Sequence, residues 1–321
     1  MFKRALIVLL TAVCVLQLGA CGGRTKPKSE VSLLGDPGYK NGFVVSPTGK
    51  GNEKPGGRDA FDYMGTASGA YWNVSQHSCN KSLYNGTETF EDGFYTYTDA
   101  EEPDDVAKTV RVNPTTGEIS LNMLTSRDYT APRQGNEAWC HLLIDTGFSG
   151  VRELFTMEKL TLDISFTFTQ MDNRLGNDFV YNLHTAQFQL YFVIGTNNTR
   201  DGKQQFWFGV PFFDYREKSL KGPDGALDAY TQMYISSMGN EDIMEDIATV
   251  GERVDISVDL KPYIQETLLN AQAVGFMTYS SPDDLYLVNM NLGWECPGTF
   301  DVGVDIHNFD LIAKLLPEYV E

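Results

Sequence analysis

Strict alternation of apolar and polar residues is the feature of this chain that most restricts its fold. Apolar side chains occupy every second position from Leu160 to Phe168, and polar residues fill the positions between them without exception. A repeat of two is the period of a β-strand with one buried and one exposed face. The same alternation recurs at four further places, in residues 188–194, 206–212, 254–260 and 300–306.

This repetition predicts an all-β chain. Antiparallel strands with one exposed face alternate in this way, whereas parallel strands buried on both faces give continuous apolar runs. We therefore expect a two-sheet antiparallel sandwich with one short helix. The helix should follow Asp259, with Pro262 in its first turn, and should plug one end of the sandwich. Its apolar face would consist of Leu260, Ile264, Leu268 and Ala271.

Three segments are expected along the chain. Residues 1–20 combine Lys3 and Arg4 with an apolar stretch too short for a resident membrane span, which is the pattern of a signal peptide. Residues 21–58 are rich in Gly, Pro, Lys and Ser and predict a flexible tether with one short edge strand at 42–45. Residues 59–321 show neither a second linker nor an internal repeat and predict one β-sandwich domain.

The apolar stretch ends in Leu18, Gly19, Ala20 and Cys21, which resembles the lipobox of bacterial lipoproteins. The resemblance implies a secreted chain whose lipidated Cys21 anchors it in the cell envelope. Gly22 stands where an aspartate would signal retention at the inner membrane of a Gram-negative cell, so that signal is missing. The anchor is therefore expected in the outer face of the cytoplasmic membrane or in the outer membrane, depending on the wall type of the host. An ordinary signal peptide with a chance cysteine is the alternative.

The net charge and the cysteines limit the kinds of ligand and metal ion that we expect the chain to bind. The formal net charge of -18 disfavours nucleic acid, which would be repelled. Beyond Cys21 the cysteines are Cys79, Cys140 and Cys296, with no C-x-x-C spacing and no closely spaced histidines, so a zinc site is not expected. At most one intramolecular disulfide is available, and its pair is left open.

Two neighbouring strands are expected to carry unusual side chains on their exposed face. Gln187, Gln189 and Tyr191 occupy the outward positions of one strand, and Gln205 and Trp207 those of the next. Amides donate and accept hydrogen bonds as sugar hydroxyls do, and aromatic rings pack against the C–H face of a sugar. This face therefore predicts a glycan platform. Tyr234 is expected to extend it, outward with Tyr230 and Gln232, while Thr231, Met233 and Ile235 face inward.

Two alternatives remain open for these aromatic residues. The 60–150 segment, itself rich in aromatic residues, could cover the platform, and Trp207 would then be core. Near the C-terminus Asn291 and Trp294 lie in a run of amides beside Glu295 and a Pro-Gly turn. That run is either a ligand-binding loop or a hairpin in which Trp294 caps the core.

The chain's ending, from Gly298 to Leu311, resembles the last strand of galactose-binding-like jelly rolls found in carbohydrate-binding modules. The resemblance implies a jelly-roll sandwich that binds polysaccharide or oligosaccharide. His307 and Asn308 stand where those modules often carry an acidic pair for a structural calcium ion. We expect no cofactor; the oxygen-rich loops 172–178 and 281–284 are the remaining calcium candidates. A concanavalin-like sandwich is equally compatible with the strands.

No established catalytic motif is present. Asp301 with Asp305 and Asp255 with Asp259 have strand spacing for a carboxylate pair, but no aromatic residue shares their face. The 212–216 loop, ending in Arg216, is where we would look first for chemistry. We expect a surface-anchored, non-catalytic carbohydrate-binding lipoprotein. The alternatives are a sandwich-fold glycoside hydrolase or polysaccharide lyase, and a structural or adhesion lipoprotein of the envelope.

Overall fold

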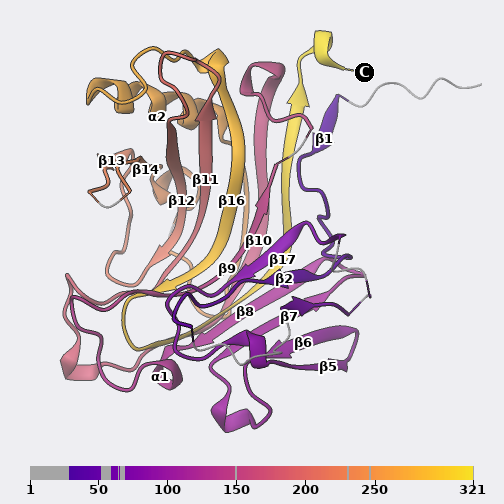
Figure 1. Ribbon diagram of the computed structural model, residues 1–321, viewed down its shortest axis with the longest axis vertical. Helices are drawn as coiled ribbons and strands as arrows, with labels where there is room; N and C mark the ends of the chain where they lie inside the picture. Colours follow the sequence, from indigo (N-terminus) through magenta and orange to yellow (C-terminus); the bar gives the residue numbers. More distant parts are fainter. Residues whose placement is uncertain are drawn as a thin grey trace, which may run out of the picture.

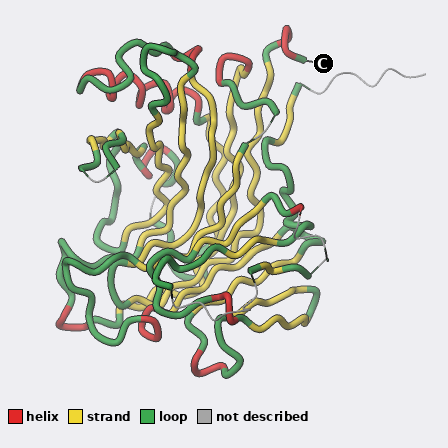
Figure 2. Tube along the Cα trace, viewed as in Figure 1, coloured by secondary structure: helices red, strands yellow, loops and turns green. Residues whose placement is uncertain are grey.

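The protein is a sandwich of two β-sheets, shown here as a computed structural model (Figures 1 and 2). The structure describes residues 29–51, 59–63, 65, 69–148, 150–229, 231–245 and 247–320. Strands dominate these residues, and helices are confined to short pieces at the ends of strands and in the connections (Figure 2). The predicted fold class, an all-β jelly-roll sandwich of two mainly antiparallel sheets with a short helix, is confirmed.

The first sheet has eight strands. Its order is β15 (Arg253–Asp259), β10 (Met157–Asn173), β17 (Phe300–Leu315), β8 (Glu118–Leu124), β7 (Lys108–Asn113), β6 (Phe94–Thr98) and β5 (Thr87–Glu91). The short strand β1 (Glu30–Ser32) pairs with the far end of β17. All of these pairings are antiparallel, as the alternating sequence predicts.

The second sheet has nine strands and carries the face of interest. Its order is β13 (Asp224–Leu227), β14 (Tyr234–Ser237), β12 (Gln205–Asp214), β11 (Gln187–Thr196), β16 (Leu285–Cys296), β9 (Cys140–Gly147), β4 (Trp72–Ser75), β2 (Phe43–Val45) and β3 (Ala60–Phe61). Two pairings are parallel, β12 with β14 and β2 with β4, and the others are antiparallel.

One aromatic core joins the two sheets. Phe166 and Phe168 of β10 meet Phe188 of β11 at ring-centroid distances of 5.5 and 5.6 Å. Trp294 of β16 lies 5.5 Å from Phe168 and 5.1 Å from Phe188. Rings at these separations pack with tilted or edge-on geometry, which adds to the free energy gained from burying their surface. The inward positions of the predicted strands therefore form the core.

The helix α2 (Lys261–Ala273) lies at one end of the sandwich, above the ends of β11, β12 and β16 in Figure 1. Its predicted apolar face, Leu260, Ile264, Leu268 and Ala271, is fully buried. Asp259 accepts the backbone N–H of Lys261 at 3.1 Å, although the capping position itself is Leu260. The other helices are α1 (Thr125–Asp128) and the 3-10 turns Leu83–Asn85, Pro103–Asp105, Leu154–Thr156, Gly176–Asp178, Asn240–Asp242, Pro282–Asp284 and Pro317–Tyr319.

The expected flexible tether differs from the structure over residues 29–51. These residues form β1 and β2, and Tyr39, Phe43 and Val45 are buried in the core. The strand predicted at 42–45 is present as β2, but it pairs inside the sheet with β3 and β4. Strands of three residues are too short to display a period, so the sequence does not reveal that this segment belongs to the core. The signal peptide and Cys21 lie outside the described residues.

Among the described residues, no helix combines the length and the apolar character that crossing a bilayer requires.

Candidate functional site

A row of polar side chains crosses the outer face of the second sheet. The register places Gln187 of β11 opposite Asp214 of β12 on one side and opposite Glu295 of β16 on the other. Glu295 in turn lies opposite His141 of β9. Residues directly opposite each other in a sheet point to the same face. Four neighbouring strands therefore present a carboxylate, an amide, a second carboxyl group and an imidazole in one line.

A cleft of about 850 Å³ lies over one end of this row. Gln187, Gln189 and Tyr191 of β11 line it, and Asp214 closes the row at its edge. The wall consists of residues from the 216–229 segment together with Ile235 and Ser237 of β14. The outer face of β11 is thus accessible, with a second layer of chain beside it that could hold a ligand in place.

Glu295 is the carboxyl group with the unusual environment. Its side chain is only 16% exposed, and burial raises its pKa from 4.5 to about 7, although a hydrogen bond with Gln189 and the nearby His77 work against the shift. A carboxyl group with a pKa near 7 holds its proton at neutral pH and can also release it. Glu295 can therefore act as a general acid.

His141 complements Glu295. Its Nε2 lies 3.7 Å from the Glu295 Oε2 atom and makes no hydrogen bond to the described residues. Burial, with a contribution from His77, lowers the pKa of His141 to about 4, so the imidazole is neutral at physiological pH. Because the pKa of His141 lies below that of Glu295, a proton held by the two residues stays on the carboxyl group. The imidazole therefore leaves Glu295 as the proton donor of the row.

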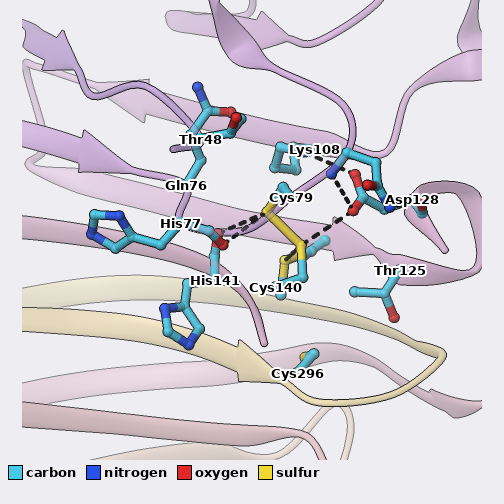
Figure 3. Close-up of a disulfide and its surroundings, with 12 residues drawn as sticks. Thr48, Gln76, His77, Cys79, Lys108, Thr125, Asp128, Cys140, His141 and Cys296 are labelled. Atoms are coloured by element: carbon cyan, nitrogen blue, oxygen red, sulfur yellow. Dashed lines mark hydrogen bonds and ion pairs between the residues drawn. A yellow bond between two sulfur atoms is a disulfide. The ribbon is translucent and has the colours of Figure 1, made fainter. Parts of the chain in front are cut away.

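A disulfide holds the histidines together. Cys79 and Cys140 form the disulfide, and Cys296 is free and buried. His77 and His141 lie close to these cysteines in sequence, and their rings meet edge-on at 6.0 Å. Figure 3 shows both histidines on one side of the disulfide and Lys108 with Asp128 on the other. The disulfide that the sequence left unassigned thus fixes the segments that carry the imidazoles.

Asp214 is held in the ionised form. Burial alone would raise its pKa, but hydrogen bonds from Arg216 and Thr185 outweigh burial and keep the pKa below its usual value. Arg216 donates to both carboxylate oxygens at 3.0 and 2.6 Å, and Thr185 Oγ1 donates at 2.7 Å. Gln187 Nε2 donates a further hydrogen bond to Asp214 Oδ2 at 2.7 Å. Asp214 and Glu295 therefore favour opposite protonation states in one row.

The structure brings some of the predicted platform residues together and separates others. Gln187, Gln189 and Tyr191 share the cleft, although Gln189 is only 7% exposed. Gln205 and Trp207 lie half-buried on the same face outside the cleft. The Trp207 ring meets Tyr191 edge-on at 5.9 Å, and its Nε1 lies 3.3 Å from Met233 Sδ. The described residues of the 60–150 segment do not line the cleft, and β4 and β9 of that segment extend the sheet itself.

Two predicted contact residues point into the core instead. Tyr234 is 3% exposed and stacks on Phe276 at 6.4 Å, because β14 begins at this residue with the opposite phase to the one predicted. Ile235 faces the cleft in its place. Trp294 is fully buried, and its Nε1 donates to the Leu121 carbonyl at 3.1 Å. The tryptophan therefore caps the core and offers no surface to a sugar.

Asn291 is on the outer face, opposite Tyr191 on one side and Asp145 on the other. Its Oδ1 is buried and makes no hydrogen bond to the described residues. Residues 289–296 are thus strand, where the sequence suggested a loop or hairpin. Recognising that strand would have revealed Glu295, because Asn289, Asn291, Gly293 and Glu295 alternate with apolar residues and point outward.

The described residues offer few ligands for a metal ion. Cys79, Asp128 and Cys140 are the one group of His, Cys, Asp or Glu side chains whose ligand atoms all lie within 4.8 Å of one another. The disulfide occupies both sulfur atoms. In the candidate calcium loops, Asp172 pairs with Arg174 at 2.9 Å, and Asp284 accepts the backbone N–H of Ser281 at 2.7 Å. A calcium ion at either loop stays a prediction.

No family model matches this sequence, and no curated protein sequence is similar to it. Several solved structures share its sandwich. They include a family 12 xyloglucanase from Bacillus licheniformis, with 11% identity, 70% of this chain and 95% of that chain covered, and a TM-score of 0.38. Endoglucanase Cel12A from Rhodothermus marinus gives 13% identity, coverages of 68% and 91%, and a TM-score of 0.38. The xyloglucanase domain of NopAA from Sinorhizobium fredii, solved with cellobiose, gives 11% identity, coverages of 70% of this chain and 95% of that chain, and a TM-score of 0.35.

These findings correct the function expected from the sequence. The similar structures reported above are glycoside hydrolases, and this finding overturns the expectation of a non-catalytic binding protein that is not an enzyme. The jelly roll is confirmed, while the finer resemblance to galactose-binding-like modules finds no support. Because the identities and TM-scores are low, the similarity extends to the fold alone, and residue roles come from the geometry of this chain.

Replacing Glu295 should change how stability depends on pH. The folded protein binds an extra proton at Glu295 between pH 4.5 and about 7, so its free energy of unfolding falls as pH rises through this window. In Glu295→Gln this loss disappears. The free energy of unfolding of the variant, taken relative to wild type, should therefore rise by roughly 3 kcal/mol between pH 4 and pH 8, since one pKa unit is about 1.4 kcal/mol.

Urea denaturation of both proteins at the two pH values measures this difference. The opposite contribution of His141, which charges below about pH 4 in the folded state, is present in both proteins and cancels in the comparison. Glu102→Gln, at an exposed carboxylate, is the control and should give a flat difference. A flat difference for Glu295→Gln as well would show that its carboxyl group ionises normally.

Proposed function

We propose that this chain is a glycoside hydrolase that acts on a polysaccharide bound across the outer face of the second sheet. The observation that carries the proposal is Glu295, a largely buried carboxyl group with a pKa of about 7 beside an open cleft. Glycoside hydrolysis needs a proton donor for the departing sugar oxygen, and a raised carboxyl pKa supplies one at neutral pH.

The cleft has the groups that a sugar chain requires. The Gln187 and Gln189 amides line it, and each can donate to one hydroxyl group and accept from another. Tyr191 adds an aromatic ring for the apolar face of a pyranose. Asn291 continues the polar surface onto β16, next to Tyr191. A chain of sugars lying across β11 and β16 would meet all four side chains.

The second carboxylate is Asp214. It lies two strands from Glu295, with Gln187 between them, which corresponds to roughly 10 Å. Inverting enzymes hold their two carboxyl groups about 6.5–9.5 Å apart, with room for a water molecule, whereas retaining enzymes need about 5 Å. In the proposed reaction Glu295 protonates the leaving oxygen, and Asp214, ionised, orients the attacking water once substrate displaces the Gln187 amide.

Other carboxylates suit these roles less well. Asp145 points to the same face but stands four residues along β9 from His141, about 13 Å away. Its oxygens accept hydrogen bonds from Asn73 Nδ2 and from Ser75 Oγ. Glu217 is on the cleft wall, where its carboxylate accepts the Tyr181 hydroxyl. Neither shares a row with Glu295.

Incubation of the protein with soluble polysaccharides tests this proposal. Xyloglucan and cellulose derivatives come first, since a xyloglucanase and a cellulase are among the similar structures. We expect new reducing ends, and first products whose anomeric configuration is inverted by NMR. Retention of configuration would remove Asp214 from its role. Absence of reducing ends across a broad glycan panel would refute hydrolysis.

We also propose that Cys21 carries the lipid and that the enzyme works at the cell surface, where polysaccharide reaches it. The support is the sequence from Leu18 to Cys21 after a signal-peptide pattern. Two or more acyl chains would anchor the protein stably. Growth with a labelled fatty acid tests this: wild type should take up label and Cys21→Ser should not.

A further inference from the structure

Lys108 is a lysine with no access to solvent. Its Nζ lies 3.5 Å from Asp99 Oδ2 and 3.5 Å from Asp128 Oδ1, and all three side chains are at most 1% exposed. Nζ also donates to the Lys81 carbonyl at 2.7 Å. Fully buried lysines are rare, because removing an ammonium group from water costs several kcal/mol even when it is paired. This cluster stands apart from the proposed active site.

The two carboxylates around Lys108 are held differently. Asp99 Oδ1 accepts two backbone N–H groups, from Ala107 at 2.8 Å and from Lys108 at 3.1 Å. Asp99 Oδ2 is buried, has no hydrogen-bond donor among the described residues and lies 3.5 Å from the Lys108 ammonium group. One oxygen of Asp99 is thus polarised by two donors, and the other faces an amine.

Asp128 is fixed by its own set of contacts. Its Oδ1 accepts the Lys81 backbone N–H at 2.7 Å, and its Oδ2 accepts that of Asn80 at 2.8 Å. Figure 3 shows the Asp128 carboxylate directed at Lys108, on the side of the disulfide away from the histidines. The backbone contacts hold both oxygens of Asp128 in place, with Oδ1 close enough to Nζ to accept a proton from it.

We propose that Lys108 and Asp99 become joined by an amide bond between their side chains. Asp128 takes a proton from the Lys108 ammonium, and the freed amine attacks Cγ of Asp99. The backbone N–H groups of Ala107 and Lys108 stabilise the negative charge that develops on Oδ1. Asp128 then delivers protons from Nζ to Oδ2, which leaves as water. Overall, an ammonium and a carboxylate give one amide and one water molecule, with no oxidant or cofactor.

The protein interior favours this condensation for two reasons. Holding amine and carboxyl at contact distance replaces an encounter in water by a unimolecular step, which is worth effective molarities of about 10⁵ M or more. The product is neutral, so the reaction removes one buried cation and one buried anion and the cost of keeping them from water. The amide joins the chain just after β6 to the first residue of β7, at one corner of the sheet.

Tryptic digestion of the reduced full-length protein tests the bond directly. Lys108 is the one lysine or arginine between Lys81 and Arg111, and Asp99 lies within the same stretch. An amide on Nζ blocks cleavage after Lys108. We expect a single peptide of residues 82–111 whose mass is lower by one water molecule. Fragmentation should show no breaks between residues 99 and 108, because the link closes that segment into a ring.

Each other outcome is decisive. Separate peptides 82–108 and 109–111 of unmodified mass would overturn the proposal and leave an ordinary buried ion pair. Peptide 82–108 lacking one water, with Lys108 cleaved, would indicate dehydration of an aspartate without a link and would also overturn it. Asp99→Ala should restore cleavage after Lys108. Asp128→Asn should leave Lys108 largely unlinked, and a fully linked Asp128→Asn protein would exclude the proposed proton carrier.

Discussion

Glu295→Gln is expected to lower polysaccharide turnover by about 10²–10⁴-fold, the usual contribution of a general acid. Glutamine keeps the size of the side chain and its hydrogen bond with Gln189, but it has no proton to give to the leaving oxygen. Binding of an oligosaccharide should change little, because Gln187, Gln189 and Tyr191 are untouched. Initial rates of reducing-end release, together with calorimetric titration of an oligosaccharide, separate the two effects.

A second measurement makes this prediction specific. The proposed acid must be protonated, so the rate of the wild-type enzyme should fall as pH rises through about 7. Glu102→Gln, which changes an exposed carboxylate far along the sequence from the row, should behave as wild type. If Glu295→Gln kept the wild-type rate and pH profile, the proton donor would have to be another group.

Trp294→Ala is expected to cost about 3–5 kcal/mol of unfolding free energy, the range for removing a large buried aromatic side chain. The indole packs between Phe168 and Phe188 and within 6.5 Å of Phe213, and it donates a hydrogen bond to the Leu121 carbonyl. Alanine would leave a cavity between the sheets and would remove the hydrogen bond to the Leu121 carbonyl. Urea denaturation of the variant measures the loss.

Trp207→Ala is the matched control for this prediction. Trp207 has the same side chain on the same sheet, but it is half-buried on the outer face, next to Tyr191. Less apolar surface returns to water when it is removed, so the loss should be clearly smaller. Equal losses for the two variants would mean that Trp294 does not carry the packing described here.

The long strands could be predicted from the sequence because their pattern is set by local geometry. A side chain in a strand must point to one of two faces, and a core tolerates few errors over ten residues such as 160–169. The same logic placed Gln187, Gln189 and Tyr191 on the open face. The strands β1 and β14, of three and four residues, have too few positions to show a period, and the inverted phase at Tyr234 follows from that.

Only part of the candidate site can be predicted from the sequence. Amides and rings were recognised by type, but Glu295 and His141 acquire their roles from burial and from each other, and the register between β9 and β16 brings them together. That register joins residues about 150 positions apart in the chain, which no local pattern encodes. The Gly-Trp-Glu-Cys-Pro run suggested a loop because of its glycine and proline, although its alternation was that of a strand.

The order of strands in the second sheet also governs when the polar row of Asp214, Gln187, Glu295 and His141 can form. β16 enters between β9 and β11, which are made much earlier, and β17 similarly enters between β8 and β10. Until β16 and β17 are inserted, the chain has the Gln187 amide but neither Glu295 in its place nor the continuous sheet beneath the row. Such late, non-local closure is characteristic of slow-folding topologies. The polar row and the complete fold are therefore formed in the same folding step.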